Sequence, residues 1–120
     1  MSRRGMVMGV TTEAGWALLE VRAQHWADGK SSSTLRWRGF PTIYPDFGEA
    51  VSWAHSGSAV FGTPSERRVA HPAVENAVVV IEPPSLWMVF PIPAGVDRRS
   101  FSERIYRAAP DDWMLRVLLP

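Results

Sequence analysis

Apolar and polar residues alternate along two segments in the first third of the chain. Residues 16–23 place Ala17, Leu19, Val21 and Ala23 on one side of an extended backbone and Trp16, Leu18, Glu20 and Arg22 on the other. Residues 34–38 alternate in the same way, with Leu35 and Trp37 opposite Arg36 and Arg38. A period of two residues predicts β-strands, and the Asp28-Gly29 turn signal between the segments favours an antiparallel pair.

The clearest helix signal follows these strands. Asp46 and Glu49 have the spacing of a capping box, in which each side chain satisfies a backbone N–H at the helix start. The residues that follow place an apolar stripe at helical period, made of Phe47, Ala50, Val51 and Ala54. We therefore predict a helix over residues 46–56.

A second helix is predicted over residues 98–109. Asp97 stands in the capping position, although Ser100 and Glu103 form a competing capping box one turn later. Phe101, Ile105 and Ala108 provide its apolar stripe. Pro110 ends it, because proline cannot continue a helix.

Four further segments have the composition of strands. Residues 77–81 form a continuous β-branched run, and residues 86–90 return as its expected antiparallel partner. Residues 6–10 and 58–62 are predicted as short strands.

The remaining segments complete the expected fold. Residues 63–76 contain two prolines and few periodic apolar positions, so a long loop is predicted there. Residues 113–119 fit either period, and a strand is preferred to a helix that starts at Pro110. The elements predict one α+β domain over residues 1–120, in which a mostly antiparallel sheet of about five to seven short strands packs with two helices.

Composition narrows the classes of function. The chain has no cysteine, which excludes disulfides, thiolate nucleophiles and cysteine-ligated metals. No apolar run is long enough to span a bilayer and no signal-peptide pattern is visible, so we expect a cytoplasmic protein without a membrane partner. The net charge of +1 offers little bulk attraction for nucleic acid, which makes such a partner possible but not favoured.

Two residue types are in excess. The chain has six tryptophans, and its basic residues are twelve arginines with a single lysine, Lys30. Tryptophan and arginine dominate binding hot spots, so the excess indicates a recognition surface. We attribute the arginine bias chiefly to high-GC coding, which is typical of many bacteria and their phages.

The sequence predicts no catalytic residue, no cofactor and no metal site. His25, His55 and His71 lack the spacing of metal ligands, and we expect each of them to be structural or simply exposed. No Gly-x-Ser-x-Gly elbow and no glycine-rich phosphate loop are present.

Pairing the first two strands predicts a docking surface. If Leu19, Val21, Leu35 and Trp37 face the core, the opposite side carries Trp16, Leu18, Glu20, Arg22, Arg36, Arg38 and Phe40, with Trp26 in the loop at one end. Glu20 is expected to form an exposed ion pair with Arg36 or Arg38 across the strands. Either a helix of the same chain or a partner covers the apolar side chains, and both alternatives stay open.

Three functional hypotheses follow. The first is a non-catalytic protein-interaction module, such as a small accessory, inhibitor or immunity-type protein of bacterial or phage origin, that docks through this face on a partner protein or on its own copy as a homodimer. The alternative is a small-molecule-binding protein or minimal enzyme with a site between sheet and helices that uses His25, His55 or Glu49. The third is binding of single-stranded nucleic acid, because Arg36, Trp37 and Arg38 combine cations with an aromatic ring.

Overall fold

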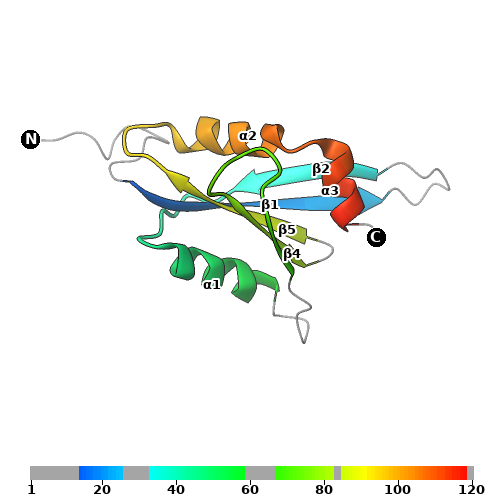
Figure 1. Ribbon diagram of the computed structural model, residues 1–120, viewed down its shortest axis with the longest axis horizontal. Helices are drawn as coiled ribbons and strands as arrows, with labels where there is room; N and C mark the ends of the chain where they lie inside the picture. Colours follow the sequence, from blue (N-terminus) through cyan, green and yellow to red (C-terminus); the bar gives the residue numbers. More distant parts are fainter. Residues whose placement is uncertain (1–13, 26–32, 59–66, 83–84, 119–120) are drawn as a thin grey trace, which may run out of the picture.

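The computed structural model describes residues 14–25, 33–58, 67–82 and 85–118. They form one antiparallel sheet with helices on both faces (Figure 1). Its strands are β1 (Gly15–His25), β2 (Ser33–Gly39), β3 (Arg67–Ala70), β4 (Val78–Glu82) and β5 (Ser85–Ile92), in the spatial order β2-β1-β5-β4-β3. The helices are α1 (Phe47–Ser58), α2 (Arg98–Ala108) and α3 (Asp111–Leu118). The α+β class is confirmed, with three helices rather than two among the described residues.

The sheet consists of two hairpins joined at its centre. The β1–β2 pair places Glu20 opposite Arg38, which confirms the antiparallel pairing expected from the alternation. The β4–β5 pair is confirmed as well, with Val80 opposite Trp87. Since β1 also pairs with β5 over residues 15–22, Glu20 has Trp87 as its second cross-strand neighbour. The middle of β1, residues 19–22, therefore has a strand on each side, whereas β2 is an edge strand of the sheet.

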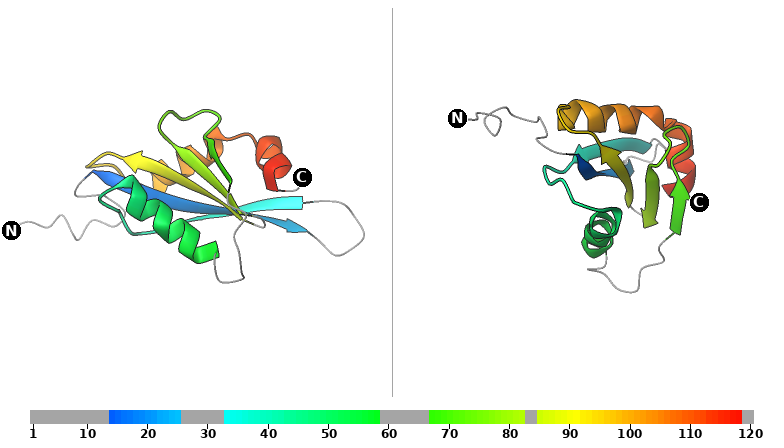
Figure 2. Two further views of the ribbon diagram at one scale, coloured as in Figure 1. Left: turned by 60° about the horizontal axis from the view of Figure 1, so that its bottom comes forward. Right: turned by 60° about the vertical axis from the view of Figure 1, so that its left-hand side comes forward.

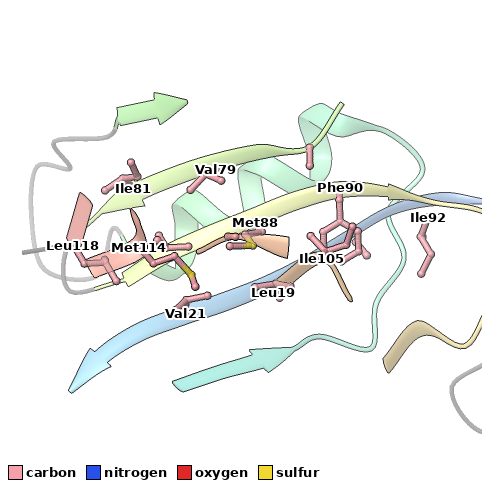
Figure 3. Packing of buried hydrophobic residues seen from close by; sticks show 14 residues of the cluster. Leu19, Val21, Val79, Ile81, Met88, Phe90, Ile92, Ile105, Met114 and Leu118 are labelled. Atoms are coloured by element: carbon pink, nitrogen blue, oxygen red, sulfur yellow. The ribbon is translucent and has the colours of Figure 1, made fainter. Parts of the chain in front are cut away.

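One face of the sheet packs on α2 and α3 and holds the larger core. The inward side chains of three strands meet Ile105 of α2 and Met114 and Leu118 of α3 (Figure 3). The strand residues of this cluster include Leu19, Val21, Val79, Ile81, Met88, Phe90 and Ile92. All of them are buried, as expected for alternate positions of strands that are covered on this face.

The other face packs on α1 and holds a smaller core. Ala50 and Ala54 have no exposed surface, and these short side chains let α1 approach Trp87 and Val89 closely. The helix lies over β4, β5 and β1. The β1–β2 ribbon extends past the end of α1, so part of this face has no helix over it (Figure 2).

Both predicted helix starts are confirmed. Asp46 Oδ1 accepts a hydrogen bond from the Glu49 N–H at 2.8 Å, directly before α1. Asp97 Oδ2 accepts hydrogen bonds from the backbone N–H of Ser100 at 3.1 Å and from its hydroxyl at 2.6 Å. Asp97, rather than Ser100, is therefore the N-cap of α2.

Two predictions about secondary structure are wrong. Residues 113–119 are not a strand, because α3 covers 111–118, with Asp112 and Arg116 paired one turn apart at 3.2 Å. Met114 and Leu118, four residues apart, are the buried side chains of this helix. The segment also alternates apolar and polar residues, so its helical spacing was not recognised in the sequence. The loop predicted over 63–76 contains β3, a four-residue edge strand whose exposed arginines gave no apolar period. The strand predicted at 58–62 starts on the last residue of α1, and its other residues, like 6–10, lie outside the described residues.

Candidate functional site

The β1–β2 ribbon carries most of the predicted docking residues on its α1 side. Cross-strand register places Arg22 opposite Arg36 and Glu20 opposite Arg38. We call the side-chain surface of these four residues the arginine face. Trp26 lies outside the described residues.

The structure answers the question of what covers the apolar part of the predicted docking surface. Leu18 is only 2% exposed and packs beneath α1. Trp16 makes an edge-to-face contact with Phe47 of α1, with ring centroids 5.1 Å apart. Phe40 packs on Trp87, with ring centroids 5.5 Å apart. Leu18 therefore belongs to the core and is not available to a partner, whereas Trp16 and Phe40 pack against this core and stay partly exposed.

Glu20 is buried rather than exposed, which corrects the expected surface ion pair. Its side chain lies between β2 and β5 with a residue exposure of 6%. Oε1 accepts a hydrogen bond from Arg38 Nε at 2.9 Å, and Oε2 accepts one from the Ser85 hydroxyl at 2.7 Å. Arg22 Nε lies 3.6 Å from Oε2 and donates to the Ser85 hydroxyl at 3.2 Å. The sequence pattern indicated β2 as the neighbour of β1, but it gave no signal for the second neighbour, β5, which supplies Ser85.

Glu20 orients the two arginines beside it. Arg22 and Arg38 keep 62% and 70% of their side chains exposed, so only their Nε ends are held. The Arg38 guanidinium lies 5.0 Å from the centroid of the Phe40 ring, a cation–π contact that fixes its plane further. Each arginine thus presents terminal N–H donors to solvent from an anchored position.

The β2 edge is the second component of the site. Phe40 N–H donates to the Leu18 carbonyl at 3.2 Å, and hydrogen-bonded pairs alternate along an antiparallel ladder. The backbone groups of Arg36 and Arg38 therefore point toward β1. The groups that point away from it belong to Leu35, Trp37 and Gly39. We call this row of outward N–H and C=O groups the β2 edge, and no other strand of the described chain pairs with it.

Further arginines lie next to the β2 edge. A pocket of about 310 Å³ is lined by Trp37, Arg38, Gly39, Arg98 and Arg99. Arg98 and Arg99 occupy the first turn of α2, which has no acidic residue and where positive charge opposes the helix dipole. Among the described residues, no carboxylate forms an ion pair with Arg36, Arg98 or Arg99. The local sequence pattern gave no signal that Arg98 and Arg99 belong to this site, because they are far from β2 in the chain.

A second hollow lies between α1 and the arginine face. This pocket, of about 330 Å³, is lined by Leu18, Glu20, Arg22, Arg38, Phe40, Tyr44, Trp53 and Trp87, and we call it the aromatic pocket. Trp53 is 58% exposed and is the only large hydrophobic side chain that is exposed among the described residues. Trp53 lies off the apolar stripe of α1, and this position in the sequence could have predicted that its side chain is exposed.

Of the residues proposed for a small-molecule site or enzyme, the structure describes the side chain of Glu49 alone. Glu49 lies exposed in the first turn of α1, and the side chains of His25 and His55 lie outside the described residues. His71 is structural: its Nδ1 accepts hydrogen bonds from the N–H groups of Ala73 and Val74, and its Nε2 bonds the Ile105 carbonyl, each at 3.0 Å. Burial lowers the pKa of His71, although the Ile105 bond acts in the opposite direction. Within the described ranges, no three histidine or acidic side chains group as metal ligands would.

None of the described helices has the length and apolar character needed to cross a membrane. The sequence matches no protein-family model and no curated protein, and the fold matches no solved structure.

Proposed function

We propose that the protein is an interaction module that binds an acidic, extended segment of a partner protein as an added strand on the β2 edge. The supporting observation is that unpaired backbone groups lie there beside several arginines, of which Arg36 and Arg99 form no ion pair with a described carboxylate. Strand addition satisfies the backbone groups, while alternate side chains of the added segment provide specificity. A cytoplasmic setting, as expected from the sequence and compatible with the lack of cysteine, remains part of this proposal.

Charge favours an acidic segment over a second copy of the chain. In an added strand, every second side chain lies beside Arg36 and Arg38 on the arginine face. Two β2 strands paired antiparallel would instead bring these arginines close to those of the other copy, which is destabilising. Glu20 offsets only part of this positive charge, because its single carboxylate lies beside both Arg22 and Arg38, whereas Arg36 forms no ion pair with a described carboxylate. The homodimer considered from the sequence is therefore the weaker choice.

The geometry favours a peptide over single-stranded nucleic acid. The β2 edge presents N–H and C=O groups in alternation, and a peptide backbone supplies the matching partners for both. Phosphates accept hydrogen bonds but do not donate them at neutral pH. In addition, Trp37 stacks on Tyr106 with ring centroids 5.4 Å apart, so one face of this ring is already engaged and is closed to a base.

Binding of a defined peptide tests the proposal. The probe is a fluorescein-labelled peptide of alternating glutamate and valine, measured by fluorescence anisotropy. We expect Arg36→Glu and Arg99→Glu each to weaken binding by about tenfold or more, the effect of roughly 1.4 kcal/mol. Arg107→Glu is the matched control, because Arg107 pairs with Glu103 at 2.8 Å elsewhere on α2, and it should change binding less than about threefold.

Backbone methylation separates strand addition from simple charge attraction. Peptides methylated on the amide nitrogens of alternate residues lose the donors along one edge only. Methylation in one register should abolish binding, whereas methylation in the other register should leave it nearly unchanged. Equal binding by both methylated peptides, or tighter binding of an oligothymidine of similar length, would overturn the proposal.

A further inference from the structure

We infer that the aromatic pocket binds a small aromatic carboxylate, a ligand class independent of the peptide at the β2 edge. The pocket lies on the α1 side of the sheet. Its aromatic walls come from α1, from the segment between β2 and α1, and from β5, whereas its charged residues come from β1 and β2. It is thus built by segments from separate parts of the chain.

The aromatic walls are held by the surrounding fold. Tyr44 is buried and exchanges two backbone hydrogen bonds with Trp16, each of 2.8 Å, which fasten its segment to β1. The Trp53 ring lies 6.4 Å from that of Tyr44, centroid to centroid, at an angle of 32° between planes. Trp53 therefore presents an exposed indole next to a fixed phenol ring. A planar ring that enters the pocket gains contact with both.

Burial also affects the Tyr44 phenol. It raises the pKa of Tyr44, and the Glu49 charge acts in the same direction, whereas a hydrogen bond with Thr42 opposes them. The phenol is therefore neutral at physiological pH, so it places no negative charge at the pocket wall. Glu49 itself is not among the residues that line the pocket.

The charged residues of the pocket select an anion. The Nε atoms of Arg22 and Arg38 are engaged with Ser85 and Glu20, while their terminal nitrogens form no hydrogen bond within the described part of the chain. A guanidinium with its Nε end anchored presents its remaining donors in a fixed plane, which suits a carboxylate. The two arginines exceed the one carboxylate, Glu20, by one positive charge, so the charged lining of the pocket is net positive and favours an anion over a cation.

The size of the pocket limits the ligand. At about 330 Å³ it falls near the lower end of the range for small-ligand sites, roughly 300–1,000 Å³. A single or fused aromatic ring with a short acidic side chain fits this volume. Indole-3-acetate has this form and serves as the probe.

Calorimetric titration with three related indoles tests the inference. Indole-3-acetate carries the carboxylate, indole-3-acetamide keeps the shape without the charge, and tryptamine carries a positive charge. We expect the acid to bind at least about tenfold more tightly than either analogue, since a charge-assisted pair with arginine adds over 1.4 kcal/mol. Tighter binding of tryptamine, or equal binding of all three indoles, would contradict the inference, as would no detectable heat from any of them.

Variants locate the binding. Trp53→Ala and Arg22→Gln should each raise the Kd for indole-3-acetate by about tenfold, and both side chains are exposed enough for the fold to survive. Arg36→Gln is the matched control, because Arg36 lies on the same arginine face but does not line the pocket. Binding unchanged by Trp53→Ala would place the ligand elsewhere. Since Trp53 is absent from the β2 edge, failure here leaves the peptide result standing, and the reverse also holds.

Discussion

Trp37 of β2 stacks on Tyr106 of α2, with ring centroids 5.4 Å apart and an angle of 22° between the planes. The contact holds the edge strand β2 against α2, which covers one face of the sheet. The outward N–H and C=O groups of Trp37 therefore lie in the plane of the sheet, whereas its side chain points out of that plane toward α2. A rigid edge of this kind reduces the entropy lost when another strand adds to it.

Removing this contact should weaken both stability and peptide binding. Trp37→Ala is expected to lower the free energy of unfolding by about 2–3 kcal/mol, since a half-buried indole loses its packing and its stacking partner. Amide hydrogen exchange in β2 should speed up more than exchange in β4. Uniform acceleration across the sheet would show that Trp37 supports the whole fold and not the β2 edge in particular.

Glu20 should be energetically coupled to Arg38. Glu20→Gln is expected to cost about 1–3 kcal/mol in urea denaturation, because the buried side chain keeps its shape but loses a charge-assisted hydrogen bond. A double-mutant cycle with Arg38→Gln should yield a coupling of roughly 1 kcal/mol. The exposed Arg107–Glu103 pair provides the comparison, and its cycle should give no more than about 0.5 kcal/mol. Equal couplings for the two pairs would mean that burial of Glu20 adds nothing.

Ser102 offers a stabilising substitution. Its hydroxyl is fully buried on α2 and has no hydrogen-bond partner within the described structure. Ser102→Ala should raise the free energy of unfolding by about 1 kcal/mol, because the desolvated hydroxyl is removed and alanine favours helix. Ser52→Ala, at an exposed position of α1, is the control and should change stability by less than about 0.5 kcal/mol. A loss of stability with Ser102→Ala would mean that the hydroxyl has a partner in solution.

Stability should decline in mild acid because of His71. Its pKa is lowered in the folded protein, so the unfolded chain takes up the proton more readily. The contribution of neutral His71 is complete above its ordinary pKa of about 6.5 and is lost as pH falls below that value toward the folded pKa. His71→Asn keeps an acceptor for the Ala73 and Val74 N–H groups but cannot titrate.

Denaturation of both proteins between about pH 5 and pH 8 measures this effect. The stability difference between the wild type and His71→Asn should shrink as the pH falls, because only the wild type must exclude a proton from position 71. The other histidines are common to both proteins and cancel in the difference. A difference that stays constant with pH would show that His71 does not titrate differently in the folded state.

Substitution of alanine for two glycines, Gly15 and Gly48, should change the free energy of unfolding in opposite directions. A Cβ on Gly15 would lie 2.6 Å from the Tyr44 carbonyl oxygen, and that backbone is held by its bonds to Trp16. Gly15→Ala should therefore cost about 2 kcal/mol or more in thermal or urea unfolding. A Cβ on Gly48 meets only the Asp46 carboxylate at an ordinary 3.4 Å, so Gly48→Ala should stabilise α1 by about 0.5 kcal/mol. Similar effects at both positions would contradict the close approach at Gly15.

Local patterns in the sequence predicted the elements with regular signals. The alternation in β1 and β2, the β-branched run of β4 and the acidic caps of α1 and α2 all correspond to observed structure. Each of these signals depends on residues within a few positions of one another. The wrong assignments were α3, whose short apolar pattern fits two periods, and β3, which is held by pairing with β4 rather than by its own residues.

The candidate site was predicted only in part, because its composition depends on contacts between distant segments. The alternation correctly placed Glu20 and Arg38 on one face. It could not reveal that β5 pairs with β1 on the other side, which buries Glu20 and supplies Ser85. Nor could it show that α1 covers Leu18.

The position of β1 beside β5 determines how the chain can reach its native state. Ser85 and Glu20 are 65 positions apart in sequence, whereas each hairpin joins strands that are neighbours in the chain. The hairpins can close early, but the central ladder must close a long loop, and non-local closure slows folding. Until the two halves meet, each exposes an unpaired apolar strand to other chains. Concentration during refolding should therefore matter more for this protein than for a helical bundle of equal size.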